Sequence, residues 1–360
     1  MGPSLIVHAT NVVGLGAVRL AQSLLPAIEG NVRIAALTLL LPDQGELAGY
    51  VRQREATQVQ HYRRSLPKAV SRLVECLRPP IRSMPQQAVL VLGDLPLRGI
   101  ERQTLLLHSA NLLVPEEQVA ARLRLRMAIG RRVLAQNLRW VDSVVVQGGF
   151  LQALFQWRFP AHAHKLVVVG HPPPTLYASA APVRQALAGG RLRLFYPSAA
   201  YDHKNHALLR RLGELDVIDR ITVTLDRDEV DGLDRPMFRF IGRLSELDCL
   251  LEYRRSHALL FVSRLESFGL PLVEAMSLGL PIICPDLPYA RDLCGDQAVY
   301  FADNDADSLG RAIVSLHRRL VSGWHAQWHD RLARLPRDWA EVADRLVAVS
   351  LGHRPGLNTG

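Results

Sequence analysis

The chain lacks the features that mark disulfide-stapled, secreted or membrane-spanning proteins. It has 360 residues and 4 cysteines, Cys76, Cys249, Cys284 and Cys294, which show no metal-ligand spacing. The last three lie in or beside apolar segments, which favours buried free thiols in a reducing cytoplasm. The longest apolar runs, such as residues 34–41, are far shorter than the roughly 20 residues of a membrane span. The apolar start has neither the basic leader nor the cleavage site of a signal peptide, so we expect a cytoplasmic protein.

Positive charge is concentrated in the first half. Residues 1–190 carry 21 lysines and arginines against 10 acidic residues, whereas residues 191–360 carry 22 against 24. The basic residues gather in residues 52–82 and 122–139, and both segments resemble helices with apolar stripes and arginines elsewhere. That pattern suits docking on an anionic membrane, and ordinary solvated helices explain it equally well. Aromatic residues are not interleaved with the basic ones, which disfavours a nucleic-acid partner.

Short apolar strands alternate with helical stretches, the pattern of a parallel sheet covered on both faces. In the first half we expect strands at residues 5–9, 32–40, 88–92, 104–108, 143–146 and 166–169. In the second half we expect them at residues 192–196, 220–225, 238–241, 258–262, 280–284 and 298–301. Residues 170–190 contain three successive prolines and two terminal glycines, which indicates a linker. The sequence therefore predicts two α/β domains.

Residues 261–284, FVSRLESFGLPLVEAMSLGLPIIC, read as strand, loop, short helix and strand. Pro271 suits the first helical position, and Gly279 suits the residue just past the helix end. Glu266 in the loop and Glu274 in the helix lie roughly 10 Å apart at about 1.5 Å per residue. This exceeds the roughly 5 Å between the carboxylates of a retaining glycosidase. The pair fits two parts of one extended ligand, with the N–H groups of the helix start between them as an anion seat, and a nucleotide diphosphate sugar has that layout.

This segment also carries a resemblance to a known family. The retaining glycosyltransferase family of GT-B fold has a signature similar to the run Ser263, Glu266, Ser267, Phe268, Gly269, Leu270, Pro271, Glu274 and Ala275. The family includes mannosyl-, glucosyl- and fucosyltransferases of bacterial polysaccharide assembly. The resemblance covers nearly the whole chain in order, strongly in residues 190–300. It implies an α/β protein with two facing Rossmann-like domains and an active site in the cleft between them.

The resemblance also implies domain boundaries. Residues 1–172 would form the acceptor-side domain, followed by a linker at residues 173–190 and a nucleotide-sugar-binding domain at residues 191–337. The amphipathic last helix, within residues 338–360, is expected to cross back onto the first domain. The family needs no metal or other cofactor, and we expect none here, although acidic triplets start at residues 226 and 303.

Catalytic roles follow from the same resemblance for Glu266, Lys204 and His108. Glu266 would orient the sugar hydroxyls, Lys204 would meet the diphosphate, and His108, at the end of a strand, would touch the donor sugar. The family commonly has an arginine six residues before this lysine, where the chain has Ser198. The remaining donor-binding candidates are Gly14, Gly16, Ser198, Gly242, Arg243, Ser267, Phe268, Gly269, Leu270, Pro271 and Glu274. Among these, the glycine loop and Arg243 are explained about as well by simple turns.

The implied reaction is transfer of a hexose from a nucleotide diphosphate, with retention, to a glycan or lipid-linked acceptor in polysaccharide or lipopolysaccharide synthesis. The His203-Lys204-Asn205 run favours a guanosine donor through its similarity to mannosyltransferase-like members. An acceptor held at the inner face of the plasma membrane would explain the lopsided basic charge. Two alternatives stay open: a nucleotide-sugar epimerase of GT-B architecture, and a catalytically silent GT-B scaffold, for which Ser198 is the best argument.

Overall fold

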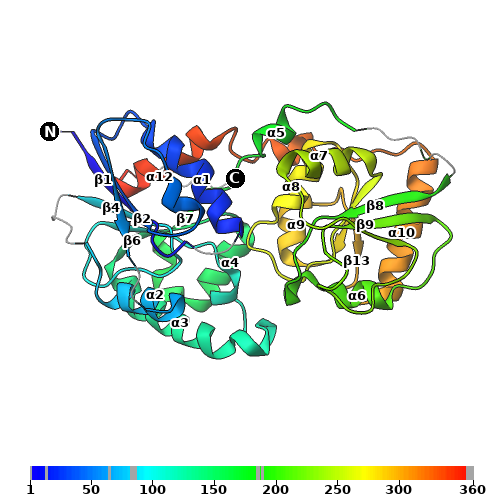
Figure 1. Cartoon of the computed structure of the whole chain (residues 1–360), viewed down its shortest axis with the longest axis horizontal. Helices are drawn as coiled ribbons and strands as arrows, with labels where there is room; N and C mark the ends of the chain where they lie inside the picture. The colour runs from blue at the N-terminus through cyan, green and yellow to red at the C-terminus, as the bar shows by residue number, and fades with distance from the viewer. Residues whose placement is uncertain are drawn as a thin grey trace. The chain divides into compact units, whose positions relative to one another are not determined.

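The chain forms two compact units, each built on its own parallel sheet (Figure 1). The computed structural model describes residues 2–12, 15–63, 66–81, 87–183, 187 and 190–353. Unit 1 consists of Met1–Pro172 and Pro336–Gly360, and unit 2 of Pro173–Leu335. The predicted α/β class, with two Rossmann-like domains, is confirmed.

The sheet of unit 1 has seven parallel strands in the order β3-β2-β1-β4-β5-β6-β7. They are β1 (Ser4–His8), β2 (Ala36–Pro42), β3 (Thr57–Tyr62), β4 (Ala88–Val91), β5 (Gln103–Leu106), β6 (Val141–Val146) and β7 (Leu166–Val168). Strand β1 pairs with β2 and β4, so that Leu5 lies opposite Leu37 and Ala88. The central strands are buried and almost wholly apolar, because helices cover both faces of a parallel sheet.

Strand β3 was not predicted, because residues 52–82 were expected to be helical throughout. The segment TQVQHY instead forms an edge strand that pairs with β2 along its whole length. Thr57 and Val59 alternate with glutamines, which is the period of a half-buried strand. An edge strand needs only one partner and few apolar residues, so its signal was hidden among the surrounding arginines. The helical part of the segment begins only at residue 68.

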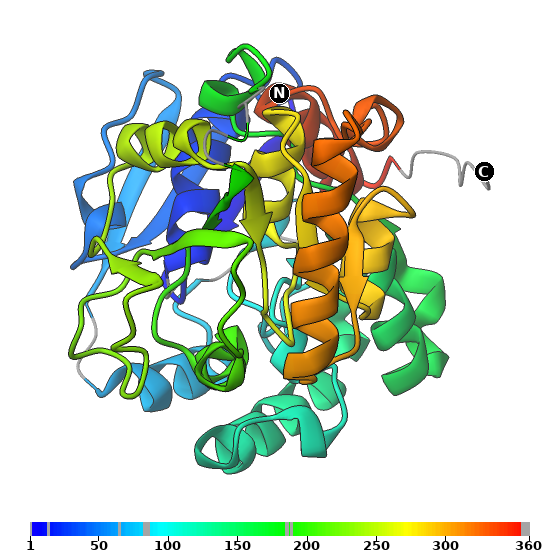
Figure 2. The same ribbon diagram turned by 90° about the vertical axis from the view of Figure 1, so that its right-hand side faces the viewer.

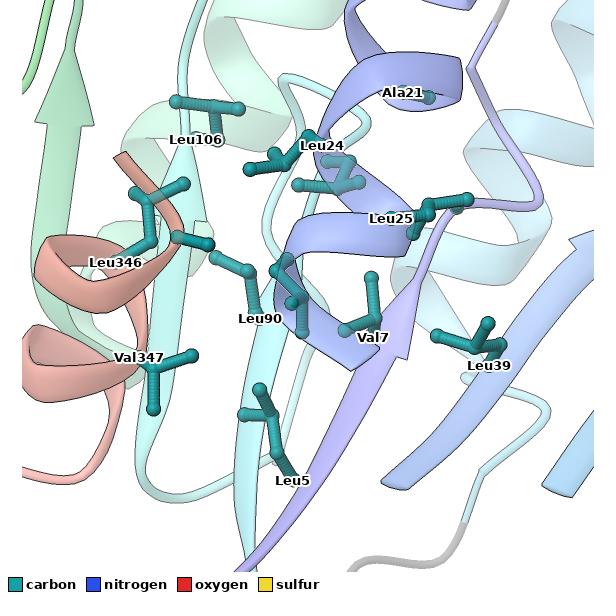
Figure 3. Packing of buried hydrophobic residues seen from close by; sticks show 14 of the residues in the cluster. Leu5, Val7, Ala21, Leu24, Leu25, Leu39, Leu90, Leu106, Leu346 and Val347 are labelled. Carbon is teal, nitrogen blue, oxygen red and sulfur yellow. The ribbon is translucent and has the colours of Figure 1, made fainter. Parts of the chain in front are cut away.

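The described α-helices of unit 1 are α1 (Leu15–Glu29), α2 (Lys68–Leu77), α3 (Arg124–Asn137), α4 (Gly149–Arg158) and α12 (Trp339–Ser350). Helices α1 and α12 pack against each other and over the middle of the sheet. Figure 3 shows Leu24 and Leu25 of α1, and Leu346 and Val347 of α12, directed at the strands. Each such buried side chain contributes roughly 1.5–3 kcal/mol. Asp338 caps α12 by accepting a hydrogen bond from the Glu341 N–H at 2.8 Å.

The sheet of unit 2 has six parallel strands in the order β10-β9-β8-β11-β12-β13. They are β8 (Leu192–Tyr196), β9 (Ile218–Val223), β10 (Phe238–Phe240), β11 (Ala258–Leu260), β12 (Ile282–Pro285) and β13 (Val299–Phe301), which confirms every strand predicted for the second half. The described α-helices are α5 (Thr175–Ala178), α6 (His206–Arg211), α7 (Glu246–Arg255), α8 (Leu270–Ser277), α9 (Pro288–Cys294), α10 (Ala306–Val321) and α11 (His329–Leu332). The long helix α10 packs on β12 and β13 (Figure 2).

Helix α5 lies in the segment that the sequence placed in a linker. It packs on α7 and α8 of unit 2. Its Tyr177 is fully buried, with its ring edge-on to that of Tyr253 at 5.8 Å. Prolines and small residues around this tyrosine concealed the helix, because the aromatic contact that holds it comes from a distant part of the chain.

The cysteines are not cross-linked in this fold. All four cysteines are free thiols, and three of them, Cys76, Cys284 and Cys294, are buried. Throughout the part of the chain that the structure describes, no helix is long and apolar enough to cross a membrane.

Candidate active site

Helix α8 places the two glutamates as the sequence predicts, Glu266 in the preceding loop and Glu274 within the helix. The helix begins at Leu270, so Pro271 is its second residue rather than its first. Gly279 ends it with a φ of +69°. The Gly279 N–H donates to the Met276 carbonyl at 2.9 Å, and the Leu280 N–H to the Ala275 carbonyl at 2.9 Å, which is a complete Schellman motif. Glycine is required here because other residues adopt this left-handed conformation only at a cost.

Lys204 and Glu266 form a close ion pair at the carboxyl edge of this sheet. The Lys204 Nζ lies 2.6 Å from the Glu266 Oε1, and the two side chains are only 13% and 12% exposed. Lys204 ends a 3-10 turn, Asp202–Lys204, in the connection after β8, and Glu266 lies in the loop after the neighbouring strand β11. The pair thus sits where open α/β sheets bind ligands. Both residues were predicted as site residues from the sequence, but their contact was not predicted.

Hydrogen bonds tie the two loops of this pair together. The Arg264 N–H donates to the His203 carbonyl at 2.7 Å, and the Ser263 hydroxyl donates to the same carbonyl at 3.2 Å. The Tyr289 hydroxyl donates to the Ser263 carbonyl, and the Tyr196 hydroxyl donates to the Lys204 carbonyl at 2.6 Å. Lys204 and Glu266 therefore project from a main chain that is fixed before any ligand arrives.

The histidines beside Lys204 are neutral near neutral pH. Burial, and then the charges of Lys204 and His203, lower the pKa of His206 to about 4. Burial also lowers the pKa of His203. Ser198, at the position where the family commonly has arginine, is buried, and its hydroxyl lies 2.8 Å from the His206 Nε2. Ser198 therefore serves the packing of this loop and adds no charge to it.

Glu274 is buried and accepts a hydrogen bond from a residue that was not predicted to belong to the site. The Tyr253 hydroxyl of α7 donates to the Glu274 Oε2 at 2.8 Å. Burial and the charge of Glu274 raise the pKa of Tyr253 well above its usual range, so the hydroxyl remains a donor. A tyrosine in an amphipathic helix looks like an ordinary core residue, which is why sequence reasoning missed it.

The start of α8 offers fewer N–H groups than the sequence suggested. The diphosphate was expected at the amides of residues 269–272. Pro271 has no N–H, and the Leu272 N–H donates to the Gly269 carbonyl at 2.9 Å. The anion seat therefore narrows to the N–H groups of Gly269 and Leu270. Ser267 and Phe268, which precede them, are half-buried and buried respectively.

Gly242 and Arg243 follow β10 at the same edge of the sheet. Gly242 has a φ of +65°, and a Cβ there would lie 2.8 Å from the Asp226 Oδ1. Glycine is favoured at this turn because its φ is positive and because a carboxylate from the loop after β9 lies close to it. Arg243 is exposed.

Unit 1 contains His108 and one residue that sequence reasoning missed, Asp94. Strand β5 ends at Leu106, so His108 lies two residues beyond the strand rather than at its end. The buried Asp94 Oδ1 accepts hydrogen bonds from the N–H groups of His108 at 2.8 Å and Ser109 at 2.9 Å. The His108 Nδ1 lies 3.4 Å from the same oxygen. Asp94 has a φ of +63°, and the Gly-Asp pair after a strand was the available signal.

The expected glycine loop of unit 1 lies only partly within the described residues. Gly14 lies outside the described residues. Gly16 is the second residue of α1 and is exposed. Nearby, at the end of β1, the buried His8 and Thr10 meet Glu75, whose Oε2 accepts from the Thr10 hydroxyl at 2.5 Å. Burial lowers the pKa of His8 to about 4.

Comparison with known proteins finds similarity to one family of transferases. The family model described as "Glycosyl transferases group 1" matches residues 234–318, which include Gly242, Glu266 and Glu274. This region is therefore similar to the group 1 glycosyltransferase family. The serotype-specific mannosyltransferase WbdA of Escherichia coli is 39% identical over 61 residues, 17% of this chain. The chain covers only 8% of that relative.

Solved structures of GT-B glycosyltransferases are similar to the chain as a whole. Sucrose-phosphate synthase of Thermosynechococcus elongatus is similar with a TM-score of 0.60 and 14% identity, over 97% of this chain and 94% of that one. HepE of Anabaena, solved with UDP and glucose, has a TM-score of 0.58 and 13% identity, over 98% and 96%. At these identities the likeness establishes the fold alone.

Proposed function

We propose that this group 1 glycosyltransferase moves a hexose from a nucleoside-diphosphate donor to an acceptor hydroxyl, with retention at the anomeric carbon. The observation that carries the proposal is the Lys204–Glu266 pair at 2.6 Å on the carboxyl edge of the second sheet. The pair puts a cation for a phosphate and a carboxylate for sugar hydroxyls at one place, as a sugar diphosphate requires. The family match over residues 234–318 supports the same reaction.

The donor would replace one ion pair by two separate interactions. Its diphosphate takes the Lys204 ammonium and the N–H groups of Gly269 and Leu270, while Glu266 turns to the sugar hydroxyls. Glu274, already oriented by Tyr253, accepts from the ribose hydroxyls. Lys204 and Glu266 compensate each other's charge without the donor, so neither is left as an unpaired, mostly buried charge.

Charge builds on the leaving diphosphate as the bond between the anomeric carbon and the phosphate oxygen breaks. The ammonium and the two amides stabilise that charge, and fixed donors of this kind are usually worth several kcal/mol. The acceptor oxygen bonds to the anomeric carbon on the same face, and its proton passes to the leaving phosphate oxygen. We propose that His108 contacts the sugar and that Asp94 fixes the backbone of His108.

We also propose which sugar nucleotide is the donor. The mannosyltransferase relative WbdA supports mannose as the transferred sugar. The acceptor that we propose is a glycan or a lipid-linked glycan of surface polysaccharide. The HepE complex with UDP and glucose supports UDP-glucose as the comparison donor. We favour GDP-mannose, because WbdA is a mannosyltransferase 39% identical over 61 residues and the His203-Lys204-Asn205 run favours a guanosine donor, whereas HepE is 13% identical.

A panel of sugar nucleotides tests this function. The protein is incubated with each donor, with and without candidate glycan acceptors, and the released nucleoside diphosphate is measured. Release that depends on an acceptor, highest with GDP-mannose, is expected. Release of nucleotide and free sugar without any acceptor would instead identify an epimerase. The buried, uncharged Ser198 is what favours a silent scaffold, and a scaffold would release nothing and show no thermal stabilisation by any nucleotide.

A further inference from the structure

Tyr201 exposes an aromatic ring at the carboxyl edge of the second sheet, beside the candidate donor site. Of the described phenylalanines, tryptophans and tyrosines, only Tyr201 and Trp157 are exposed, and Tyr201 is 46% exposed. Tyr201 lies in the connection after β8, and its carbonyl accepts a hydrogen bond from the Lys204 N–H at 2.9 Å. The backbone of Tyr201 is therefore part of the turn that positions the Lys204 ammonium group.

The His203 ring supports the Tyr201 ring. The two ring centroids are 5.7 Å apart, and the ring planes are inclined by only 14°, so the rings are stacked. The His203 carbonyl accepts hydrogen bonds from the Arg264 N–H at 2.7 Å and from the Ser263 hydroxyl at 3.2 Å. Burial lowers the pKa of His203, so its imidazole is neutral near neutral pH. Because the stack exists without a ligand, ordering the Tyr201 ring costs little free energy when a ligand binds.

The stack of Tyr201 on His203 lies at the hexose end of the proposed donor position. After burial, the largest influences on the pKa of His203 are the charges of Glu266, which raises it, and of Lys204, which lowers it. These two side chains therefore lie near the imidazole. In the proposed function Glu266 binds the hexose, while Glu274 binds the ribose that carries the base. Tyr201 therefore lies where a molecule next to the hexose would bind, and not where the base would bind.

An exposed tyrosine ring beside a carboxylate suits a pyranose. The C–H groups on one face of a pyranose carry a small positive charge, and the face of an aromatic ring is negative. The neighbouring Asp202 is exposed, and a carboxylate accepts hydrogen bonds from sugar hydroxyls. The same carboxylate would repel a phosphate or another anion placed on the ring. Ring and carboxylate together thus favour a neutral sugar over a phosphorylated ligand.

We propose that Tyr201 and Asp202 form the subsite for the acceptor sugar. The last pyranose of the acceptor lies on the Tyr201 ring and turns hydroxyl groups to the Asp202 carboxylate, so that another of its hydroxyls reaches the donor hexose at Glu266. This inference rests on the proposed function, because that function places the hexose at Glu266. It narrows the acceptor to a glycan that ends in a pyranose, whether or not the glycan is linked to a lipid.

Saturation-transfer difference NMR tests the subsite without turnover. The full chain is expected to bind methyl α-mannopyranoside. Tyr201→Ala should weaken this binding about fivefold, since it removes an aromatic ring contact. Tyr201→Phe keeps the ring and should bind as tightly as the native protein. Trp157→Ala removes the other exposed ring, on α4 of unit 1, and is the matched control that should leave binding unchanged.

A charge variant tests the carboxylate of the subsite. Asp202→Asn should weaken binding of methyl α-mannopyranoside about threefold, because hydrogen bonds to a charged acceptor are stronger than hydrogen bonds to a neutral amide. Native-like binding by Asp202→Asn would remove Asp202 from the subsite.

Nucleotide binding and turnover separate the acceptor subsite from the donor site. Tyr201→Ala should leave the calorimetric affinity for GDP unchanged, raise the KM for the mannoside about fivefold and keep kcat. Native-like mannoside binding by Tyr201→Ala, no mannoside binding by the native protein, or an equal loss of GDP affinity would overturn the proposal. Mannoside binding that depends on Tyr201, without nucleotide release from any donor, would contradict the transferase function alone. Acceptor-dependent release with a native-like KM in Tyr201→Ala would contradict the subsite alone.

Discussion

The two units share one architecture and place their ionisable groups differently. In unit 2 the Lys204 and Glu266 side chains are 13% and 12% exposed, within reach of a ligand at the carboxyl edge of the sheet. In unit 1 the corresponding edge has His8 and Glu75 at 0% exposure and Asp94 at 6%. We therefore propose that groups of the same chemistry serve a binding site in unit 2 and the internal structure of the fold in unit 1. The exposed fraction of the side chains distinguishes these two uses.

The difference extends to the outer surfaces. In unit 1, Ser71 and Glu75 of α2 are buried, and the apolar Val70, Val74 and Leu77 of the same helix are exposed. In unit 2, helix α10 packs its apolar residues on β12 and β13 and keeps charged residues outside. Helix α2 buries its polar side chains at the edge of the sheet, and its apolar side chains are therefore exposed on the opposite side of the helix.

The largest effect on turnover is expected from two variants that each break the Lys204–Glu266 pair. Lys204→Ala should lower kcat by roughly 100- to 1000-fold, since it removes the main cation facing the leaving diphosphate. Glu266→Gln should also abolish turnover and yet keep or strengthen binding of the free nucleoside diphosphate, because the ammonium is released from its carboxylate. Steady-state kinetics and calorimetric titration with the nucleoside diphosphate measure the two effects separately.

Arg311→Ala supplies the control for this pair, because Arg311 is an exposed cation on α10 of the same unit. It should leave both kcat and nucleotide affinity unchanged. Wild-type turnover in Lys204→Ala would remove the proposed role of the cation. Parallel loss of nucleotide affinity in both variants would show that the pair acts only as a structural unit.

Acid should destabilise unit 1 through His8. Burial lowers the pKa of His8 to about 4 from its ordinary 6.5, so the unfolded chain binds the proton more tightly than the folded chain. Stability is therefore full above pH 6.5 and falls as the pH drops toward 4, by roughly 3 kcal/mol for that gap. Burial likewise lowers the pKa of His171, to about 3, which acts in the same direction. Urea unfolding across this pH range measures the slope.

The variant His8→Asn should make this pH dependence shallower, because the contribution of His8 is removed and that of His171 stays. His61→Asn, at a half-exposed position of the same unit, serves as the comparison and should leave the slope as it is. Equal slopes in the native protein and in His8→Asn would mean that the buried imidazole does not control acid stability.

Asp94 connects the internal network of unit 1 to its candidate site residue. Asp94→Asn keeps a side chain that tolerates positive φ and removes the charge that pairs with Arg72. We expect the free energy of unfolding to fall by about 1.5–3 kcal/mol, because hydrogen bonds to a charged group are lost or weakened. Turnover should fall about tenfold through displacement of His108. Denaturant unfolding and kcat are the measurements.

The exposed pair Asp344–Arg33, at 2.8 Å, is the matched comparison for Asp94. Both of its side chains are nearly half exposed, so Asp344→Asn should cost at most about 1 kcal/mol and leave turnover unchanged. An equal loss of stability in the two variants would contradict the importance assigned to burial.

Much of the fold could be predicted because most strands are apolar runs bounded by turn residues. Every predicted strand is present, and Gly279 ends its helix as predicted. The edge strand β3 was missed because its pairing is one-sided and its residues are mostly polar. Helix α5 was missed because Tyr177 depends on Tyr253, a contact between distant parts of the chain. Patterns within a short stretch of sequence predict two kinds of element: those stabilised by neighbouring residues and those buried on both faces.

The individual residues of the candidate site could be predicted from the sequence. The contacts between these residues could not. Turn chemistry and the spacing of Glu266 and Glu274 selected the right loop and helix. The contact between Lys204 and Glu266 depends on the adjacency of β8 and β11, which no local pattern contains. Asp94 acts through the backbone N–H groups of His108 and Ser109, so the Gly-Asp pair after β4 predicted a turn and not the contact with His108.

The most direct test is a crystal structure of the protein with GDP-mannose or UDP-glucose bound. Our account predicts the diphosphate within hydrogen-bond distance of the Lys204 Nζ and of the Gly269 and Leu270 N–H groups, with the hexose against Glu266. The separation of the Lys204 Nζ from the Glu266 Oε1 should then exceed its present 2.6 Å. A donor bound elsewhere, with this pair still in contact, would contradict the account.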